Sequence, residues 1–230
     1  MSIFQQFKQW VKQSRNPLAA TINTGFITLK FIEVPAFSIV YVPVRMIYKA
    51  MKTGISYLMR ILFWTPIFKT QTSKTGKHLY LSGGMPLVQG ALSIELGNDC
   101  CISGQTRFYG ALSEQSKTQL IIGNNVDIAW QTSIHVGNKV VLGNNVKIAE
   151  KVLLAGHQGH PMESKTHTQV FSELVHLVGY IILEDDVRLA SGVTVLKGVT
   201  IGKGTQVTAG SVVTTNLPPN VIAGGLLYPL

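Results

Sequence analysis

The chain has 230 residues, with 20 Lys and Arg against 11 Asp and Glu, a formal net charge of +9 and only two cysteines. This length suits one domain with an appendage, while two cysteines exclude a disulfide scaffold and favour a reducing compartment. The first 79 residues hold eleven Lys or Arg and a single acid, Glu33, whereas the remainder is nearly neutral. The charge would suit nucleic acid, but no recognition motif accompanies it, so no nucleic-acid partner is expected.

Two stretches of the basic region, residues 3–11 and 44–62, carry apolar side chains at helical spacing with basic residues on other faces. Trp10, Phe63 and Trp64 add aromatic anchors, a combination typical of helices that lie in a membrane interface. The uncharged runs in this region, residues 34–44 among them, are shorter than the ~18 residues that span a bilayer, and the first residues make a poor signal peptide. Residues 1–78 are therefore predicted to form a basic amphipathic helical region on an anionic membrane surface. The alternative is packing on the rest of the protein or at an oligomer interface.

From residue 79 onward the sequence follows a hexapeptide period. Six consecutive units close the chain, and every sixth residue is aliphatic: Leu183, Leu189, Val195, Ile201, Val207 and Val213. Four places later in each unit comes a compact residue, except at Leu217. This period predicts a parallel β-helix in which three units make one coil. The aliphatic residue then fills the core and the compact residue lines a corner.

The repeat extends upstream to Leu96 with interruptions, including a two-residue slip before Leu142. Gly-Asn pairs at 97–98, 123–124, 137–138 and 143–144 are expected at corners, because both residues tolerate positive φ. Cys100 falls at a compact core position. Regular units do not resume between Leu154 and Leu183, so residues 155–182 are predicted to form an extruded loop on a rigid scaffold. Loops so placed often carry function.

Histidines gather in this predicted loop. It contains His157, His160 and His167, and His135 lies about one coil away. Imidazole takes up a proton near neutral pH and suits general base catalysis. Three or four histidines could instead hold a metal, and solvated loop residues without a chemical role are the third interpretation.

Residues 79–224 resemble the hexapeptide-repeat acyltransferases with a left-handed β-helix, especially the galactoside, maltose and surface-polysaccharide O-acetyltransferases. The motifs that carry the resemblance are Gly159-His160-Pro161 in the loop, the coil over residues 189–202 and the last coil over residues 207–224. The resemblance implies an all-β left-handed parallel β-helix over residues 79–230. It also implies His160 as the catalytic base. His157 falls where the family is variable and is a second catalytic candidate from its place in the same loop.

The same resemblance implies acetyl-CoA as acyl donor, a homotrimer with the site between protomers, and direct transfer without a metal. Matching positions predict cofactor contacts at Ser191, Thr208, Ala209 and Thr214, and acceptor contacts at Asp127 and Gln131. Backbone amides near residues 190–192 are expected to stabilise the oxyanion. The chain departs from the family at Arg188, at Thr215 and at its end, where a basic residue that would meet the CoA phosphates is missing. Lys197 or Lys203 is expected to replace it.

The predicted function is therefore an acetyl-CoA-dependent O-acetyltransferase that modifies a sugar or lipid-linked glycan in surface polysaccharide or glycolipid biosynthesis. We expect it to attach peripherally to the cytoplasmic face of the cell membrane. Two alternatives stay open: an acyltransferase with an amino-sugar or non-sugar acceptor, and a noncatalytic trimeric scaffold at the membrane. The β-helical carbonic anhydrases share the fold and bind zinc through histidines, but the spacing of His157 and His160 does not reproduce theirs.

Overall fold

The computed structural model describes residues 5, 10, 17, 21, 24, 27–28, 30–33, 35–110, 118–157 and 179–227. Most of the predicted helix at residues 3–11 and residues 158–178 of the predicted loop lie outside this part of the chain. The chain divides into two units, Met1–Lys52 and Thr53–Leu230. The continuous helical elements are α3 (Ser38–Met59), a π-helical turn η1 (Arg60–Trp64) and α4 (Thr65–Thr70).

The strands form three parallel sheets, built from strands three apart in sequence order except at the last coil, where β19 pairs with β17 and β20 with β18. Sheet A contains β1 (Lys74–Thr75), β4 (Leu92–Leu96), β7 (Thr118–Ile122), β10 (Lys139–Leu142), β13 (Tyr180–Leu183) and β16 (Val199–Ile201). Sheet B contains β2 (Tyr80–Ser82), β5 (Cys101–Ser103), β8 (Asp127–Ile128), β11 (Lys147–Ile148), β14 (Arg188–Leu189), β17 (Gln206–Val207) and β19 (Ile222–Ala223). Sheet C contains β3 (Leu87–Gln89), β6 (Arg107–Tyr109), β9 (Ser133–His135), β12 (Leu153–Ala155), β15 (Thr194–Leu196), β18 (Val212–Val213) and β20 (Leu226–Leu227).

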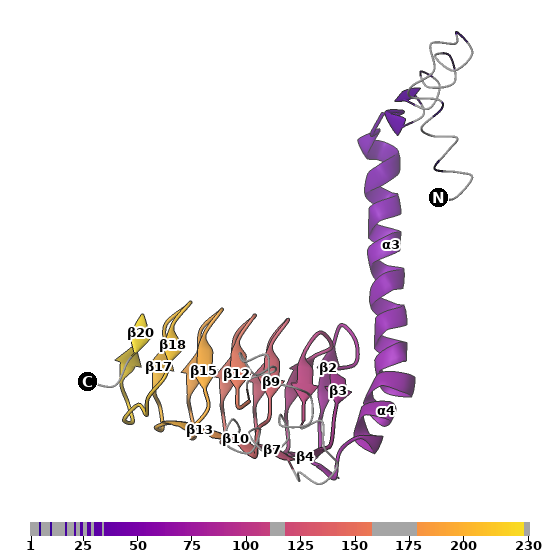
Figure 1. Cartoon of the computed structure of the whole chain (residues 1–230). Helices are drawn as coiled ribbons and strands as arrows, with labels where there is room; N and C mark the ends of the chain where they lie inside the picture. Colours follow the sequence, from indigo (N-terminus) through magenta and orange to yellow (C-terminus); the bar gives the residue numbers. More distant parts are fainter. Residues whose placement is uncertain are drawn as a thin grey trace. The chain divides into compact units, whose positions relative to one another are not determined.

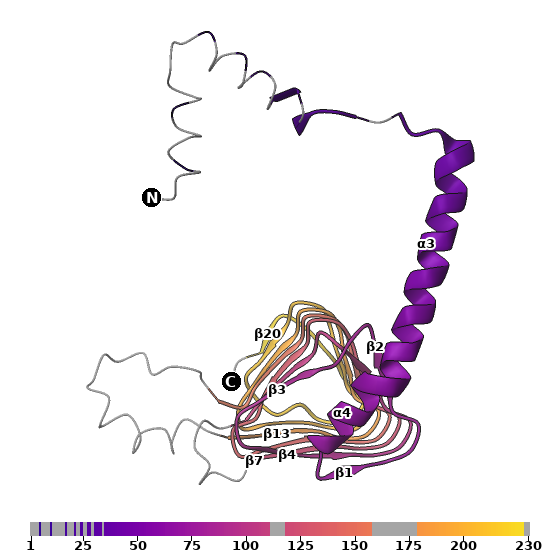
Figure 2. The same cartoon turned by 90° about the vertical axis from the view of Figure 1, so that its right-hand side faces the viewer.

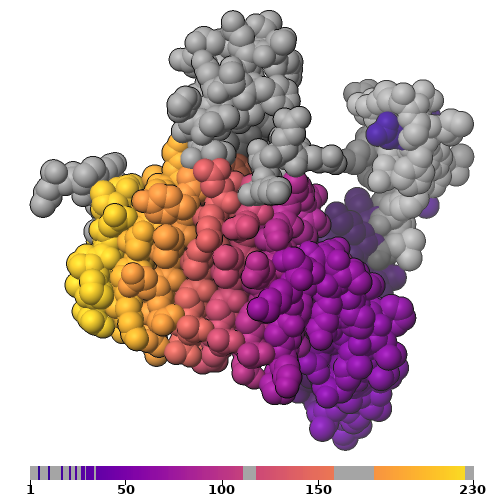
Figure 3. Space-filling view, turned by 90° about the horizontal axis from the view of Figure 1, so that it is seen from below, coloured from indigo at the N-terminus to yellow at the C-terminus, as the bar shows by residue number. Residues whose placement is uncertain are grey.

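The chain visits sheets A, B and C in turn, so that three strands make one coil (Figure 1). Viewed along their axis, the coils superpose as triangles (Figure 2). Successive coils pack directly against one another in sequence order, from magenta to yellow in Figure 3. The predicted parallel β-helix is thereby confirmed, because every ladder pairing between coils is parallel.

The hexapeptide period determines which side chains fill the triangular core. All six predicted aliphatic positions from Leu183 to Val213 are buried, and so are the compact corner residues apart from Leu217. Each buried Val, Leu or Ile side chain contributes roughly 1.5–3 kcal/mol on leaving water. Cys100 is also buried as predicted, and burial raises the pKa of its thiol. At one end, Phe68 of α4 is fully buried against the core, with its ring 6.4 Å from that of Phe108.

The corner between sheets A and B is built from an asparagine ladder, and here the expectation of positive φ at the Gly-Asn pairs is wrong. The Oδ1 of Asn124 accepts the backbone N–H of Asn98 at 2.8 Å, and the Oδ1 of Asn144 accepts that of Asn124 at 2.9 Å. Positive φ falls on the following residue, such as Asn125 and Asn145. Glycine is required instead by close packing between coils, since a Cβ on Gly97 would lie 2.5 Å from the next coil's backbone.

The connections between sheets C and A differ in length from coil to coil. They are residues 90–91, 110–117, 136–138, 156–179 and 197–198. The predicted slip before Leu142 corresponds to residues 136–138. The predicted loop, residues 155–182, is too long at both ends, because Ala155 ends β12 and residues 180–182 belong to β13. Chain length can vary at this corner because the strands on either side keep their parallel register.

Candidate functional site

The predicted loop joins the β-helix through a narrow neck of three glycines. The N–H of Gly179 donates to the carbonyl of Gly156 at 2.9 Å, and the N–H of Gly156 donates to the carbonyl of His135 at 2.8 Å. A Cβ on Gly137 would lie 2.2 Å from the Gly156 oxygen and 2.7 Å from Gly179. Only glycine lets three backbone segments approach this closely. The neck therefore fixes where residues 156 and 157 leave the coil.

Three aromatic rings are stacked in a column beside this neck. Tyr109 ends β6 and His135 ends β9, and the two are register partners in sheet C. Their ring centroids are 4.8 Å apart in an edge-on arrangement, and the His157 ring stacks on that of His135 at 5.3 Å. The column places His157 at the mouth of the loop, in the candidate site that we call the histidine corner: Tyr109, His135 and His157.

The environment of His135 favours the neutral form of its imidazole. Burial, and then the neighbouring His157, lowers the pKa of His135 below its ordinary value of 6.5. The Nε2 atom of His157 is buried. A neutral imidazole near physiological pH can accept a proton, which is the property that a general base requires. Among the residues that the structure describes, no cluster of three or more metal-ligating side chains occurs.

Of the three loop histidines considered above, the structure describes only His157. His157 lies in the histidine corner, as described above. His160, predicted to be the base, and His167 lie outside the described residues. The role of His160 stays a prediction from its motif.

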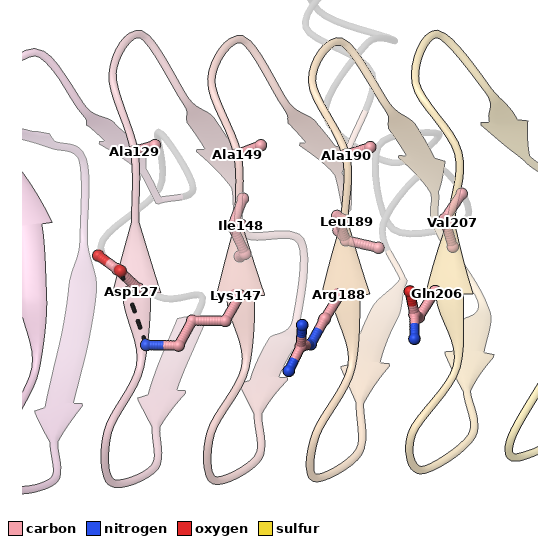
Figure 4. A pocket seen from close by; sticks show the side chains of 10 residues that line it. All are labelled: Asp127, Ala129, Lys147, Ile148, Ala149, Arg188, Leu189, Ala190, Gln206 and Val207. Atoms are coloured by element: carbon pink, nitrogen blue, oxygen red, sulfur yellow. Dashed lines mark ion pairs between the residues drawn. The ribbon is translucent and has the colours of Figure 1, made fainter. Parts of the chain in front are cut away.

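A second candidate site is a groove of about 320 Å³ on the outer face of sheet B. Ala129, Ala149 and Ala190 occupy equivalent positions on successive coils and form a row of small side chains (Figure 4). A parallel row of longer side chains borders them: Asp127, Lys147, Arg188 and Gln206. The lack of bulk along the alanine row leaves room for an extended ligand across several coils.

The bordering row brings two cations together. Lys147 and Arg188 are register partners on β11 and β14. Lys147 makes an ion pair with Asp127, with 3.6 Å between Nζ and Oδ2, and both side chains are about half exposed, so this pair contributes little to stability. The sequence marks Arg188 only as a departure from the pattern of the acyltransferases that it resembles, and it gives no sign of a role for Lys147. Aligning the hexapeptide units before and after the insertion would have shown that Lys147 and Arg188 occupy the same position in successive coils.

The predicted cofactor residues lie beside this groove, with one exception. Ser191 and Ala209 are exposed at the corner between sheets B and C, and Thr208 directly follows β17. The hydroxyl of Ser191 donates to Oε2 of Glu150 at 2.8 Å, which lowers the pKa of that carboxyl. Thr214 follows β18 at a different corner. The structure therefore groups three of the four residues.

Two of the three backbone amides at residues 190–192, where the oxyanion site is expected, already have partners in the coil. The N–H of Ala190 donates to Val207 and that of Gly192 donates to Glu150, both at 2.9 Å to a backbone carbonyl. These two amides are therefore engaged in the coil ladder, which the sequence could not reveal. Lys203, one expected phosphate contact, lies 3.7 Å from the carboxylate of Asp186.

The predicted acceptor residues Asp127 and Gln131 are not brought together. Asp127 borders the groove on sheet B, whereas Gln131 lies at the next corner with a positive φ of 58°. Gln131 lines a separate hollow of about 420 Å³ with Arg107, Ser133 and neighbouring residues. The two residues therefore face different spaces in a single chain.

No family profile and no curated protein matches this sequence. Among solved structures, a mutant of AntD, an N-acyltransferase from Bacillus cereus, in complex with dTDP-4-amino-4,6-dideoxyglucose and coenzyme A, matches with a TM-score of 0.54 and 20% identity. The match covers 71% of this chain and 84% of AntD. AntD with dTDP and 3-hydroxybutyryl-CoA matches with a TM-score of 0.53 and 19% identity, over 70% of this chain and 82% of that one. A maltose O-acetyltransferase from Clostridium difficile 630 matches with a TM-score of 0.44 and 20% identity, over 70% of this chain and 69% of that one. The AntD matches confirm the left-handed β-helical fold expected from the resemblance.

Proposed function

We propose that this protein is an acetyl-CoA-dependent O-acetyltransferase that acts on a sugar hydroxyl in surface polysaccharide or glycolipid biosynthesis. The observation that carries the proposal is the histidine corner, where an imidazole is fixed at the mouth of an insertion in a β-helical scaffold. The groove on sheet B supports it with space for an extended donor and two cations for phosphate groups. The fold shared with AntD, crystallised with coenzyme A, agrees with this donor class.

The proposed reaction is direct acetyl transfer. A histidine accepts the proton of the sugar hydroxyl while the hydroxyl oxygen attacks the thioester carbonyl carbon. The tetrahedral intermediate then collapses, the C–S bond breaks, and the departing CoA sulfur receives the proton from the histidine. General base assistance of this kind contributes on the order of 10²–10⁴-fold. This scheme needs neither an acyl-enzyme nor a metal.

Two histidines are candidates for the base, and single variants assign the role. The motif resemblance favours His160, and the described geometry favours His157. We expect His160→Ala to reduce acetyl transfer by roughly two orders of magnitude or more while leaving acetyl-CoA affinity nearly unchanged. If His157→Ala abolishes transfer and His160→Ala does not, the assignment is reversed. Acetyl-CoA titration and a transfer assay with sugars and lipid-linked glycans provide both measurements, and no acetyl-CoA binding at all would favour a noncatalytic scaffold.

An amino-sugar acceptor is the second candidate function, because AntD was crystallised with an amino sugar nucleotide. The chemistry at the base is the same, with an amine in place of the hydroxyl. Assays with matched pairs of sugars that differ only in a hydroxyl or an amine distinguish the two. Preference for the amine would replace O-acetyl transfer by N-acetyl transfer and leave the donor site unchanged.

The proposed assembly is a homotrimer with a shared site. The groove lies on the outer face of sheet B, whereas the histidine corner lies between sheets C and A, on a different side of the triangular coil. A neighbouring copy would place one protomer's groove beside another's histidines, and a closed ring satisfies such a contact. Light scattering should report about three times the 25.1 kDa chain mass. A monomer with full turnover would contradict the shared site.

The proposed location is the cytoplasmic face of the cell membrane, through α3. None of the described helices is long and apolar enough to cross a bilayer. No residue of α3 is buried, and its bases Arg45, Lys49 and Lys52 share one face. Ile47 and Met51 on the other side are 61% and 59% exposed, which leaves an apolar surface uncovered. A helix of this pattern suits the plane of an anionic membrane interface.

Vesicle flotation tests this location. Replacing Arg45, Lys49 and Lys52 with Gln should weaken partitioning to vesicles of phosphatidylglycerol and phosphatidylcholine by roughly 10²-fold, at about 1 kcal/mol per base. Neutralising Lys69, Lys74 and Lys77 serves as the charge-matched control outside α3 and should have a smaller effect. Equal flotation of the two triple variants would contradict a role for the α3 basic face.

A further inference from the structure

His135 holds the segment that carries His157 through both its backbone and its side chain. Its carbonyl accepts the N–H of Gly156 at 2.8 Å, immediately before His157. Its ring lies between those of Tyr109 and His157, at centroid distances of 4.8 Å and 5.3 Å. The backbone of His135 is fixed in turn by parallel pairing of β9 with β6 and β12. The rigid coil thus extends, through His135, to the first residue of the insertion.

We propose that His135 is a positioning residue that holds the His157 ring in one orientation. This proposal rests on the proposed function and on His157 taking part in proton transfer. A base must present its lone pair to the acceptor hydroxyl, and small displacements of such a group lower the rate strongly. The stacked ring of His135 limits the orientations open to His157 at the point where it leaves the coil.

The electrostatic part of the proposal follows from the spacing of the rings. Two imidazoles 5.3 Å apart repel when both are charged, so a proton on one disfavours a proton on the other. Burial adds to this by lowering the pKa of His135. Among the described residues, the titratable groups at this corner include Tyr109 in the same column and Lys197, whose Cβ lies against Gly179 in the following coil. At neutral pH the pair therefore keeps an unprotonated imidazole available.

Two substitutions separate the steric contribution of His135 from its charge. His135→Ala removes both the ring and the charge, whereas His135→Phe keeps an aromatic surface for stacking. Leu196→Ala is the matched control, because Leu196 occupies the same register column beyond Ala155 and has no ring contact with the pair. For each full-length variant we would measure kcat, KM for acetyl-CoA, the melting temperature and the pH dependence of kcat/KM.

We expect His135→Ala to lower kcat roughly 10-fold or more, with KM for acetyl-CoA nearly unchanged. His135→Phe should recover most of kcat because the stacking surface is restored. Both variants should leave the acid limb of the pH profile nearly in place, because the lowered pKa of His135 keeps it uncharged at neutral pH and its removal takes no positive charge away from His157. Leu196→Ala should leave kcat nearly unchanged. A merely structural role for His135 would lower the melting temperature without the split between kcat and KM and without rescue by Phe.

An NMR titration of the histidine rings tests the same pair without any assay of transfer. In the wild-type chain, the His135 and His157 resonances should titrate in a coupled manner, and His135→Phe should give a single simple curve for His157. Independent titration in the wild type would overturn the proposal, as would wild-type kcat in His135→Ala. Wild-type activity of His157→Ala would also overturn it. Failure of transfer to every sugar with coupled titration intact would instead overturn the proposed function alone.

Discussion

A methyl group at Gly137 would meet the backbone of two other segments at the neck of the insertion. The added Cβ would lie 2.2 Å from the Gly156 oxygen and 2.7 Å from the nitrogen and oxygen of Gly179. The first distance is roughly 1 Å inside ordinary carbon–oxygen contact. These neighbours are backbone atoms held by hydrogen bonds, so no flexible side chain can move aside. The neck has to open.

We expect Gly137→Ala to cost about 2–3 kcal/mol of folding free energy, the usual range for overpacking a rigid site. For a chain of this size the melting temperature should fall by roughly 4–12 °C. Opening the neck also displaces Gly156 from the His135 carbonyl, and His157 moves with it. A displacement of about 1 Å at a catalytic group can reduce turnover by roughly 10²-fold.

Gly198→Ala is the matched control, at the same corner in a later coil. Gly198 has a φ of +80° and no atom within 4 Å of an added Cβ, so this substitution should cost only ~1–2 kcal/mol of backbone strain. Thermal melting by circular dichroism and the transfer assay provide the comparison. If Gly137→Ala melts no lower than Gly198→Ala and keeps wild-type turnover, the account of the neck is refuted.

Other positions give further predictions. Ala149→Leu should fill the groove and weaken acetyl-CoA binding about 10-fold, as measured by calorimetry, and Arg188→Gln should weaken it similarly at low salt through loss of a charged hydrogen bond. Ser93→Leu on sheet A is the control. Unchanged affinity in both groove variants would mean that the donor binds elsewhere. Asn124→Ala should lower the free energy of unfolding by about 1–2 kcal/mol in urea, because it interrupts the corner ladder. The pKa of His135 in the folded chain lies below its ordinary 6.5, so the unfolded chain binds more protons there and stability should fall as pH drops below about 6.5. Melting temperatures measured against pH should show this fall in the wild type and a smaller one in His135→Phe. An equally steep fall in the variant would contradict this contribution of His135.

Much of the scaffold could be predicted from local sequence. Leu183 and the five aliphatic residues at sixfold spacing after it are buried as expected, because each coil repeats the same inward position. The hexapeptide period stops after Leu154 and resumes at Leu183, and this interruption predicted where the insertion lies. The same local reasoning misjudged the Gly-Asn pairs. Their glycines are required by contact with the next coil, and no local preference of the chain reports such a contact.

The sequence by itself determined which side chains face inward and which histidines stand near the insertion. Only the tertiary structure decided which outward-facing residues become neighbours, as with Lys147 and Arg188 across the groove, or Tyr109, His135 and His157 at the corner. The physical reason lies in the ladder between coils. Hydrogen bonds align each strand with the strand one coil away, so the lengths of the corner connections determine which distant residues share a column. A hexapeptide period repeats identically in every coil and does not encode that register.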